Sequence, residues 1–133
     1  MKVYVFGNID VPEDNQAIIA AKNLKNKNPE INFIFISPNE DVPFVGEPKV
    51  VILDAVQGID QVELIAGSNL EKLLISPRTS VHDFDLGFQL KYLKKLGKIG
   101  EVFIIGLPMQ GEIDYLRIQS ILRKLVAHDM QGS

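Results

Sequence analysis

Asp54, His82 and a pair of acids near the amino terminus are the residues of this sequence best suited to chemistry. Asp54 directly follows the apolar run 50–53, whose β-branched residues indicate a strand buried on both faces. In open α/β sheets, ligands bind outside the carboxyl ends of such strands. Asp54 is therefore expected at the rim of a site, where it could bind a metal ion or transfer a proton. A structural alternative is that it only caps the turn that follows.

The other candidate residues come from two loops. Glu13 and Asp14 precede a predicted helix, and His82 ends the loop 76–82 before a second one. Two carboxylates and an imidazole suit a borderline divalent ion such as nickel or zinc, and they leave coordination positions open for water or substrate. The alternatives are again structural, because Asp14 could be a helix N-cap and His82 a surface residue near one. His128, near the end of a predicted helix, suits the helix dipole.

The elements that would position these residues alternate between strands and helices. Apolar runs predict strands at 2–6, 31–36, 50–54, 62–66 and 101–107, with a further short one at 72–75. Apolar residues at helical spacing predict helices from 14 to about 24, over 84–96 and from about 112 onward, where the apolar stripe comprises Ile113, Leu116, Ile118, Ile121, Leu122 and Leu125. This alternation predicts an α/β three-layer sandwich, in which helices cover both faces of a mostly parallel, twisted sheet.

Length and composition restrict the domain count and the partners. The 133 residues fit one α/β domain, predicted to span 1–129, with a frayed carboxyl end at 130–133. The formal net charge of −3 argues against nucleic-acid binding, and the absence of cysteine excludes disulfides and thiolate chemistry. The first apolar run is too short for a signal peptide, and none approaches the ~20 residues of a membrane helix. We therefore expect a cytoplasmic protein without membrane insertion.

Taken in order along the chain, these motifs resemble the hydrogenase maturation proteases, which trim a carboxy-terminal extension from the large subunit of nickel–iron hydrogenases. That family opens with an apolar strand, then Gly-Asn, then a loop ending in an acidic pair. Its later landmarks are a strand ending in Asp-Ala, a loop with Ser and His before a helix, and a last strand running into Gly with a nearby Pro. The counterparts here are Gly7-Asn8, Glu13-Asp14, Asp54-Ala55, Ser76-Pro77 or Ser80-Val81-His82, and Gly106-Leu107-Pro108.

The resemblance implies a divergent, short member with a phosphorylase/hydrolase-like fold. It implies that Asp14, Asp54 and His82 converge on a metal position as ligands and catalytic residues, with Glu13 as the alternative to Asp14. The resemblance implies that the metal is nickel, supplied by the substrate, and cadmium or zinc is expected to substitute in vitro. The implied partner is the precursor of a hydrogenase large subunit. Exposed apolar residues around the loops 37–48 and 108–113 are expected to form the surface that meets it.

The sequence departs from the family pattern at several places. Asp14 stands where the family often has Glu, and the Pro-rich loop 37–48 replaces a helix of the family. Val5 stands where the family usually has glycine. Asn15-Gln16-Ala17 follows the acidic pair, where a glycine is common. Arg78 follows Ser-Pro, where the histidine often stands.

Two other classes of function fit the same residues. One is a non-catalytic metal- or protein-binding module of an assembly pathway, built on the same fold. Such a module would bind a partner without changing the partner's mass. The other is a small-molecule enzyme that uses Asp54 as a general base, for which an apolar pocket beside Asp54 is expected.

Overall fold

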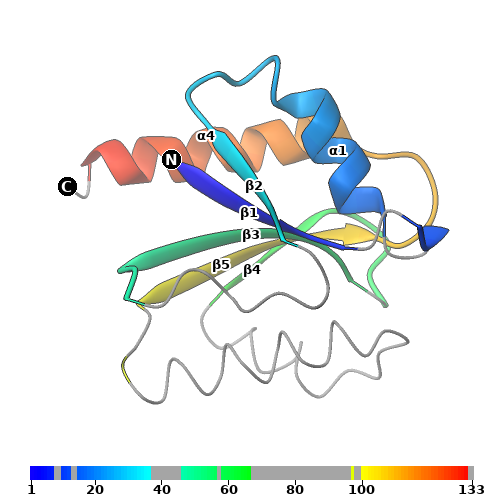
Figure 1. Ribbon diagram of the computed structural model, residues 1–133, viewed down its shortest axis with the longest axis horizontal. Coiled ribbons are helices and arrows are strands. Elements are labelled where there is room, and N and C mark those ends of the chain that lie inside the picture. The colour runs from blue at the N-terminus through cyan, green and yellow to red at the C-terminus, as the bar shows by residue number, and fades with distance from the viewer. Residues whose placement is uncertain are drawn as a thin grey trace.

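A computed structural model of the protein describes residues 1–7, 10–12, 15–36, 46–56, 58–66, 97 and 100–131. Its elements follow in the order β1 (Lys2–Phe6), α1 (Gln16–Leu24), β2 (Asn32–Ile36), β3 (Lys49–Val56), β4 (Glu63–Ala66), β5 (Glu101–Pro108) and α4 (Tyr115–Gln131) (Figure 1). The strands form one sheet in the order β2-β1-β3-β5-β4. Neighbouring strands are parallel except for β4 and β5. The predicted α/β class with a mostly parallel sheet is therefore confirmed.

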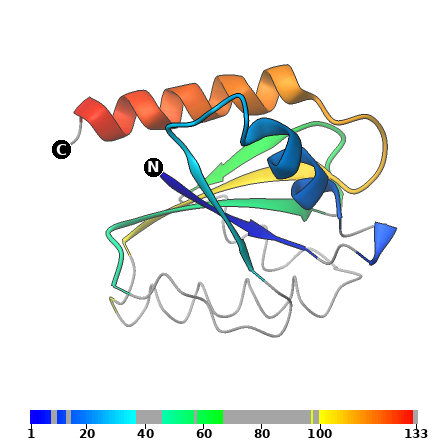
Figure 2. The same ribbon diagram turned by 45° about the horizontal axis from the view of Figure 1, so that its top comes forward.

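Both described helices pack on one face of the sheet, which we call the helix face (Figure 2). Its core joins strand residues to both helices and includes Val5, Leu53, Ile105, Leu107, Ala17, Ala21, Ile118 and Leu122. Because successive strand residues point to opposite faces, the other face carries a second core cluster that includes Tyr4, Phe6, Ile52, Val56, Ile65 and Ile104. The helix predicted over 84–96 and the strand predicted at 72–75 lie outside the described residues. None of the helices in the described part is long and apolar enough to cross a membrane.

β2 is an edge strand rather than the buried strand that its Ile and Phe residues predicted. It pairs in register with β1, from Lys2↔Asn32 to Phe6↔Ile36. Its place at the end of the strand order leaves the side chain of Phe35 40% exposed. The prediction of burial was wrong because hydrophobicity does not report where a strand lies within the sheet.

Helix α4 begins at Tyr115, later than the predicted start near Glu112. Asp114 provides the N-cap, because its Oδ1 accepts a hydrogen bond of 3.1 Å from the backbone N–H of Arg117. The helix buries Ile118 and Leu122. Leu116 lies two residues before Ile118, about 200° around the helix, and is 84% exposed. The prediction that Leu116 belongs to the apolar stripe is therefore wrong.

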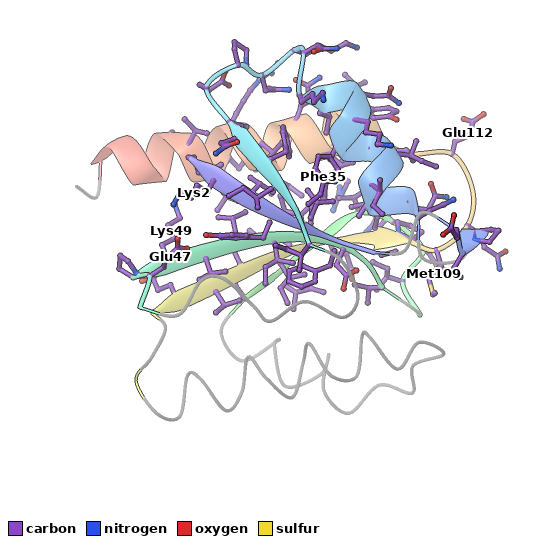
Figure 3. The ribbon with its side chains drawn as sticks, viewed as in Figure 1. Lys2, Phe35, Glu47, Lys49, Met109 and Glu112 are labelled. Atoms are coloured by element: carbon purple, nitrogen blue, oxygen red, sulfur yellow. The ribbon has the colours of Figure 1, made fainter. Side chains whose placement is uncertain are left out.

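The start of β1 and the segment before β3 are joined by polar contacts around Glu47 (Figure 3). The Tyr4 hydroxyl donates a hydrogen bond of 2.7 Å to Glu47 Oε1. Lys2 Nζ lies 3.6 Å from the same oxygen. Burial, together with this bond and the charge of Glu47, raises the pKa of Tyr4 from 10.0 to about 12.

The raised pKa of Tyr4 predicts a loss of stability in alkaline solution. The unfolded chain releases this proton near pH 10 and the folded chain near pH 12, so the free energy of unfolding falls as the pH rises through that range. Tyr4→Phe should remove this part of the pH dependence, whereas Tyr115→Phe should keep it. Denaturant unfolding of the three proteins between about pH 9 and pH 12 measures the effect. Parallel stability curves for wild type and Tyr4→Phe would contradict it.

Candidate functional site

Three landmarks of the sequence meet at the carboxyl end of the parallel strands. β1 is followed by Gly7, whose φ of 147° lies in a range that favours glycine. In the neighbouring strand β3, Asp54 is in register with Gly106 of β5. The register of β1 against β3 places Gly7 within one residue of the level of Asp54. The sheet therefore brings Gly7, Asp54 and Gly106, one residue from each of these three motifs, to its carboxyl edge.

Asp54 is buried within β3 rather than placed at its end. β3 continues past it to Val56, which is in register with Pro108 of β5. The side chain of Asp54 is 2% exposed and, by alternation along the strand, lies on the face opposite the helices, with Ile52 and Val56. Strand pairing extends two residues beyond Asp54, so this residue lies inside β3 and not in the turn that follows it.

Burial of a carboxylate in an apolar strand marks Asp54 as a functional candidate. In the described part of the chain, the buried polar or charged residues are Asn28 and Asp54. Asn28 has a structural role, because its Nδ2 donates a hydrogen bond of 2.8 Å to the carbonyl of Leu24 at the end of α1. Taking a carboxylate out of water costs several kcal/mol before any compensating interaction. Residues that break the packing rules of their own element in this way are concentrated at functional sites.

Gly106 allows apolar side chains to close over β5 beside Asp54. A Cβ atom at this position would lie 3.0 Å from Val56 Cγ2, 3.3 Å from Ile59 Cδ1 and 3.3 Å from Ile65 Cδ1. A larger residue would push these side chains away from the strand. Glycine therefore keeps the surroundings of Asp54 tightly packed on this side, which limits the access of water.

Of the predicted ligands, Asp54 is the one that falls within the described residues. Asp14, its alternative Glu13 and His82 lie outside them, as does Arg78. Helix α1 begins at Gln16, shortly after the acidic pair. Among residues that the structure describes, no three His, Asp or Glu side chains gather closely enough to hold a metal ion. The chemistry of Asp54 fits one part of the predicted site, namely a carboxylate oxygen donor at the carboxyl end of the sheet.

A cleft of about 220 Å³ lies beside the same edge, on the helix face, and is lined by Gln16, Asp60, Gln61, Val62, Leu107, Pro108, Glu112, Ile113 and Asp114. Leu107 directly follows Gly106, so the cleft and Asp54 are neighbours on opposite faces of the sheet. Gln16 Nε2 donates a hydrogen bond of 3.0 Å to the Gly111 carbonyl, which joins the start of α1 to the loop before α4.

The cleft was only partly foreseen from the sequence. The segment 108–113 was expected to meet a partner, and it forms one wall. Asp60 and Asp114 were missed, because no spacing or composition signal shows that the turn after β3 packs near the start of α4. Glu112 was assigned to the last helix, whereas it precedes that helix and is exposed at the cleft.

The fold is similar to that of solved hydrogenase maturation proteases. The structure is similar to the hydrogenase maturating endopeptidase HybD from Escherichia coli, with a TM-score of 0.67 and 14% identity over 99% of this chain and 94% of that one. It is similar to an endopeptidase from Escherichia coli, with a TM-score of 0.68 and 12% identity over 100% and 94% of the two chains.

A third similar structure is the [NiFe] hydrogenase maturation protease HybD from Thermococcus kodakarensis. Its TM-score is 0.55, with 23% identity over 86% of this chain and 83% of that one. No protein-family model and no curated protein matches the sequence. The resemblance drawn from the sequence motifs is thus confirmed at the level of the fold.

Proposed function

We propose that this protein is an endopeptidase of the hydrogenase-maturation type, which removes the carboxy-terminal extension of a nickel–iron hydrogenase large-subunit precursor in the cytoplasm. The observation that carries the proposal is the position of Asp54. It is a buried carboxylate at the carboxyl edge of a sheet with this fold, in register with Gly106 and close to the level of Gly7. All three residues belong to the motifs in which the sequence resembles the family.

In this proposal, nickel arrives as part of the substrate. Asp54 contributes one carboxylate oxygen to the ion, and Asp14 and His82 contribute the other donors, with Glu13 as the alternative to Asp14. Such a set of oxygen and nitrogen donors suits a borderline divalent ion, and cadmium or zinc is expected to occupy the same ligands in vitro.

The proposed reaction is hydrolysis of the peptide bond that joins the extension to the large subunit. A divalent ion held by these residues would supply Lewis-acid chemistry, to polarise a carbonyl or activate a water molecule. A carboxylate of the site accepts a proton from the attacking water and returns it to the leaving amine. The apolar side chains packed around Gly106 keep bulk water away from Asp54, which strengthens electrostatic interactions of its carboxylate.

The decisive experiment mixes the purified protein with nickel-loaded precursor and follows the intact mass of both chains. We expect the nickel-loaded precursor to lose the mass of its extension. The nickel-free precursor is expected to keep its full mass. In crystals soaked with cadmium, an anomalous peak is expected at ~2.0–2.4 Å from a carboxylate oxygen of Asp54. Formation of a complex with no change in the mass of the precursor would overturn the proposal in favour of a non-catalytic assembly module.

A further inference from the structure

β2 has an outer edge that no other described strand pairs. It ends the strand order, and its partner is β1 on the inner side. Asn32 and Phe35 are exposed, and Phe33 and Ile34 are half-buried (Figure 3). Proteins usually protect an edge strand with charged residues or proline, because its outward N–H and C=O groups pair readily with another chain. β2 contains neither, so its edge is suited to pairing with an extended polypeptide.

Three lysines lie near the amino end of β2. Lys22 is in the last turn of α1, and Lys25 and Lys27 are in the link from α1 to β2 (Figure 1). All three are exposed, and none forms an ion pair with a described carboxylate. Glu30 and the carboxyl end of α1, which carries about −0.5 of an elementary charge, offset part of their charge. About one to two positive charges remain, so this end of the strand suits a carboxylate.

The link that carries these lysines is held in place by local hydrogen bonds. Asn28 Nδ2 donates to the carbonyl of Leu24 at 2.8 Å, and the backbone N–H of Ile31 donates to the carbonyl of Asn28 at 3.0 Å. The nearby Lys2 is engaged elsewhere, because its Nζ lies 3.6 Å from Glu47 Oε1. The positive charge at this end of β2 therefore comes from the three lysines of α1 and the link.

The other end of β2 lies level with Asp54. β1 pairs Phe6 with Ile36 on one side, and the register of Val5 with Leu53 places Asp54 beside Phe6 on the other. Neighbouring strands are about 4.8 Å apart, so a strand added outside β2 would lie about 14 Å from Asp54. An extended chain covers that distance with about four residues.

The direction of the substrate chain matches both ends of β2. In the proposed reaction, the extension begins at the bond cut beside Asp54 and leads toward the carboxyl terminus of the precursor. It would therefore reach β2 at Ile36 and run toward Asn32, antiparallel to the strand. About four residues of passage and five of pairing bring roughly the tenth residue of the extension to the three lysines.

We propose that the outer edge of β2 binds the extension of the precursor as an antiparallel strand, so that a carboxylate near its end meets the three lysines. This proposal rests on the proposed function, because it assigns the occupant to the same substrate. Backbone hydrogen bonds to an edge strand hold a peptide whatever its sequence, and side chains beside the strand add selectivity. Phe35, on the helix face with Val5, is the apolar contact for such a side chain.

The binding test uses the first ten residues of the extension as two peptides, one with a free terminal carboxylate and one with a terminal amide. Each is added to the full-length protein while backbone amide hydrogen exchange is followed by NMR. We expect the acid peptide to slow exchange within residues 32–36 and to bind about 2- to 5-fold more tightly than the amide. Unchanged exchange in β2, or equal affinity of the two peptides, would overturn the proposal.

A matched pair of variants tests the edge itself. Phe35 and Leu64 are 40% and 41% exposed and lie on the two edge strands of the sheet, β2 and β4. A charge within an edge strand disfavours pairing with another chain. Phe35→Glu is expected to raise KM for the precursor about 5-fold with kcat nearly unchanged, and Leu64→Glu to leave both constants at their wild-type values. The same KM for both variants would contradict the assignment.

A second pair of variants tests the basic end. Lys25→Gln with Lys27→Gln removes two of the lysines, and Arg123→Gln with Lys124→Gln removes two exposed cations of α4 as the control. The lysine variant is expected to lose most of the preference for the acid peptide over the amide, whereas the control keeps it. If the lysine variant keeps the full preference, the lysines do not meet the carboxylate.

Precursor trimming distinguishes failure of this inference from failure of the proposed function. If Phe35→Glu trims with the wild-type KM while Asp54→Asn is inactive, the role of β2 fails and the endopeptidase stands. If wild type binds the acid peptide along β2 but trims no precursor, the proposed function fails and β2 remains a peptide-binding edge. A wild-type dimer in sedimentation that Phe35→Glu dissociates would overturn the proposal in favour of a second copy of this chain.

Discussion

Replacing Asp54 by asparagine is expected to slow precursor trimming by a factor on the order of 100 to 10,000, which is the usual contribution of a group that transfers protons in the transition state. Asparagine has nearly the shape of aspartate but can neither accept that proton nor offer a charged oxygen to nickel. Because the side chain is 2% exposed and the shape is kept, the fold should survive. The measurement is the rate of mass loss of nickel-loaded precursor, with unfolding curves recorded in parallel.

Glu101→Gln is the matched control for this prediction. Glu101 is an exposed carboxylate at the opposite end of the neighbouring strand, in register with Lys49. Its conversion to an amide makes the same chemical change in the same sheet, and trimming is expected to continue at the wild-type rate. If Asp54→Asn also trims the precursor at the wild-type rate, Asp54 takes no part in the reaction.

Replacing Gly100 by alanine is expected to lower the free energy of unfolding by about 3 kcal/mol or more. The new Cβ would lie 2.0 Å from the carbonyl oxygen of Pro48, which is backbone and cannot rotate away. Two backbone hydrogen bonds join the segment before β3 to the start of β5. They run from Gly100 N to Glu47 O at 3.0 Å and from Glu101 N to Pro48 O at 2.9 Å. Overpacking costs about 1–3 kcal/mol, and each lost hydrogen bond adds about 0.5–1.5 kcal/mol.

Gly58→Ala provides the comparison, measured by the same urea unfolding. Gly58 has a φ of 89°, but no atom lies within 4 Å of the position that its new Cβ would take, so the substitution carries only the backbone strain, about 1–2 kcal/mol. If Gly58→Ala lowered the free energy of unfolding as much as Gly100→Ala does, the strands would have to move apart at their amino ends and relieve the clash expected at Gly100.

The strands that carry the site could be predicted from the sequence because their side chains are buried on both faces. Continuous apolar runs at 2–6, 50–54 and 101–107 correspond to β1, β3 and β5, within two residues at each end. Only parallel strands with both faces covered require such runs. Asp54 was identified because it directly follows the apolar run 50–53, at the expected carboxyl end of a buried strand, where ligands bind in open α/β sheets.

The order of the strands and the start of the last helix could not be predicted in this way. β2 is as apolar as a central strand but lies at the sheet edge, because pairing partners are chosen by tertiary contacts. Glu112 and Asp114 are both acids that could begin a helix, and a single hydrogen bond to the N–H of Arg117 selects Asp114. The packing of Ile118 and Leu122 in the core decides which side of α4 is buried and leaves Leu116 exposed.

The cleft was not predicted because its walls come from distant parts of the chain. Asp60 follows β3, Glu112 precedes α4 and Gln16 begins α1, and only folding places these side chains around one opening. No local sequence pattern predicts that these three side chains lie around one opening.

Gly106 and Leu107 are consecutive residues whose positions in β5 belong to opposite faces of the sheet. A polypeptide that contacts the helix face at Leu107 and reaches Asp54 on the other face would have to cross the thickness of the sheet at its edge. An extended chain advances at most ~3.3–3.6 Å per residue, so this distance sets a minimum number of residues between the side chain at Leu107 and the bond that is cut. Selectivity would then depend on spacing as well as on residue type, and inserting or deleting a residue between the two points would misplace the bond even where every side chain in contact is kept.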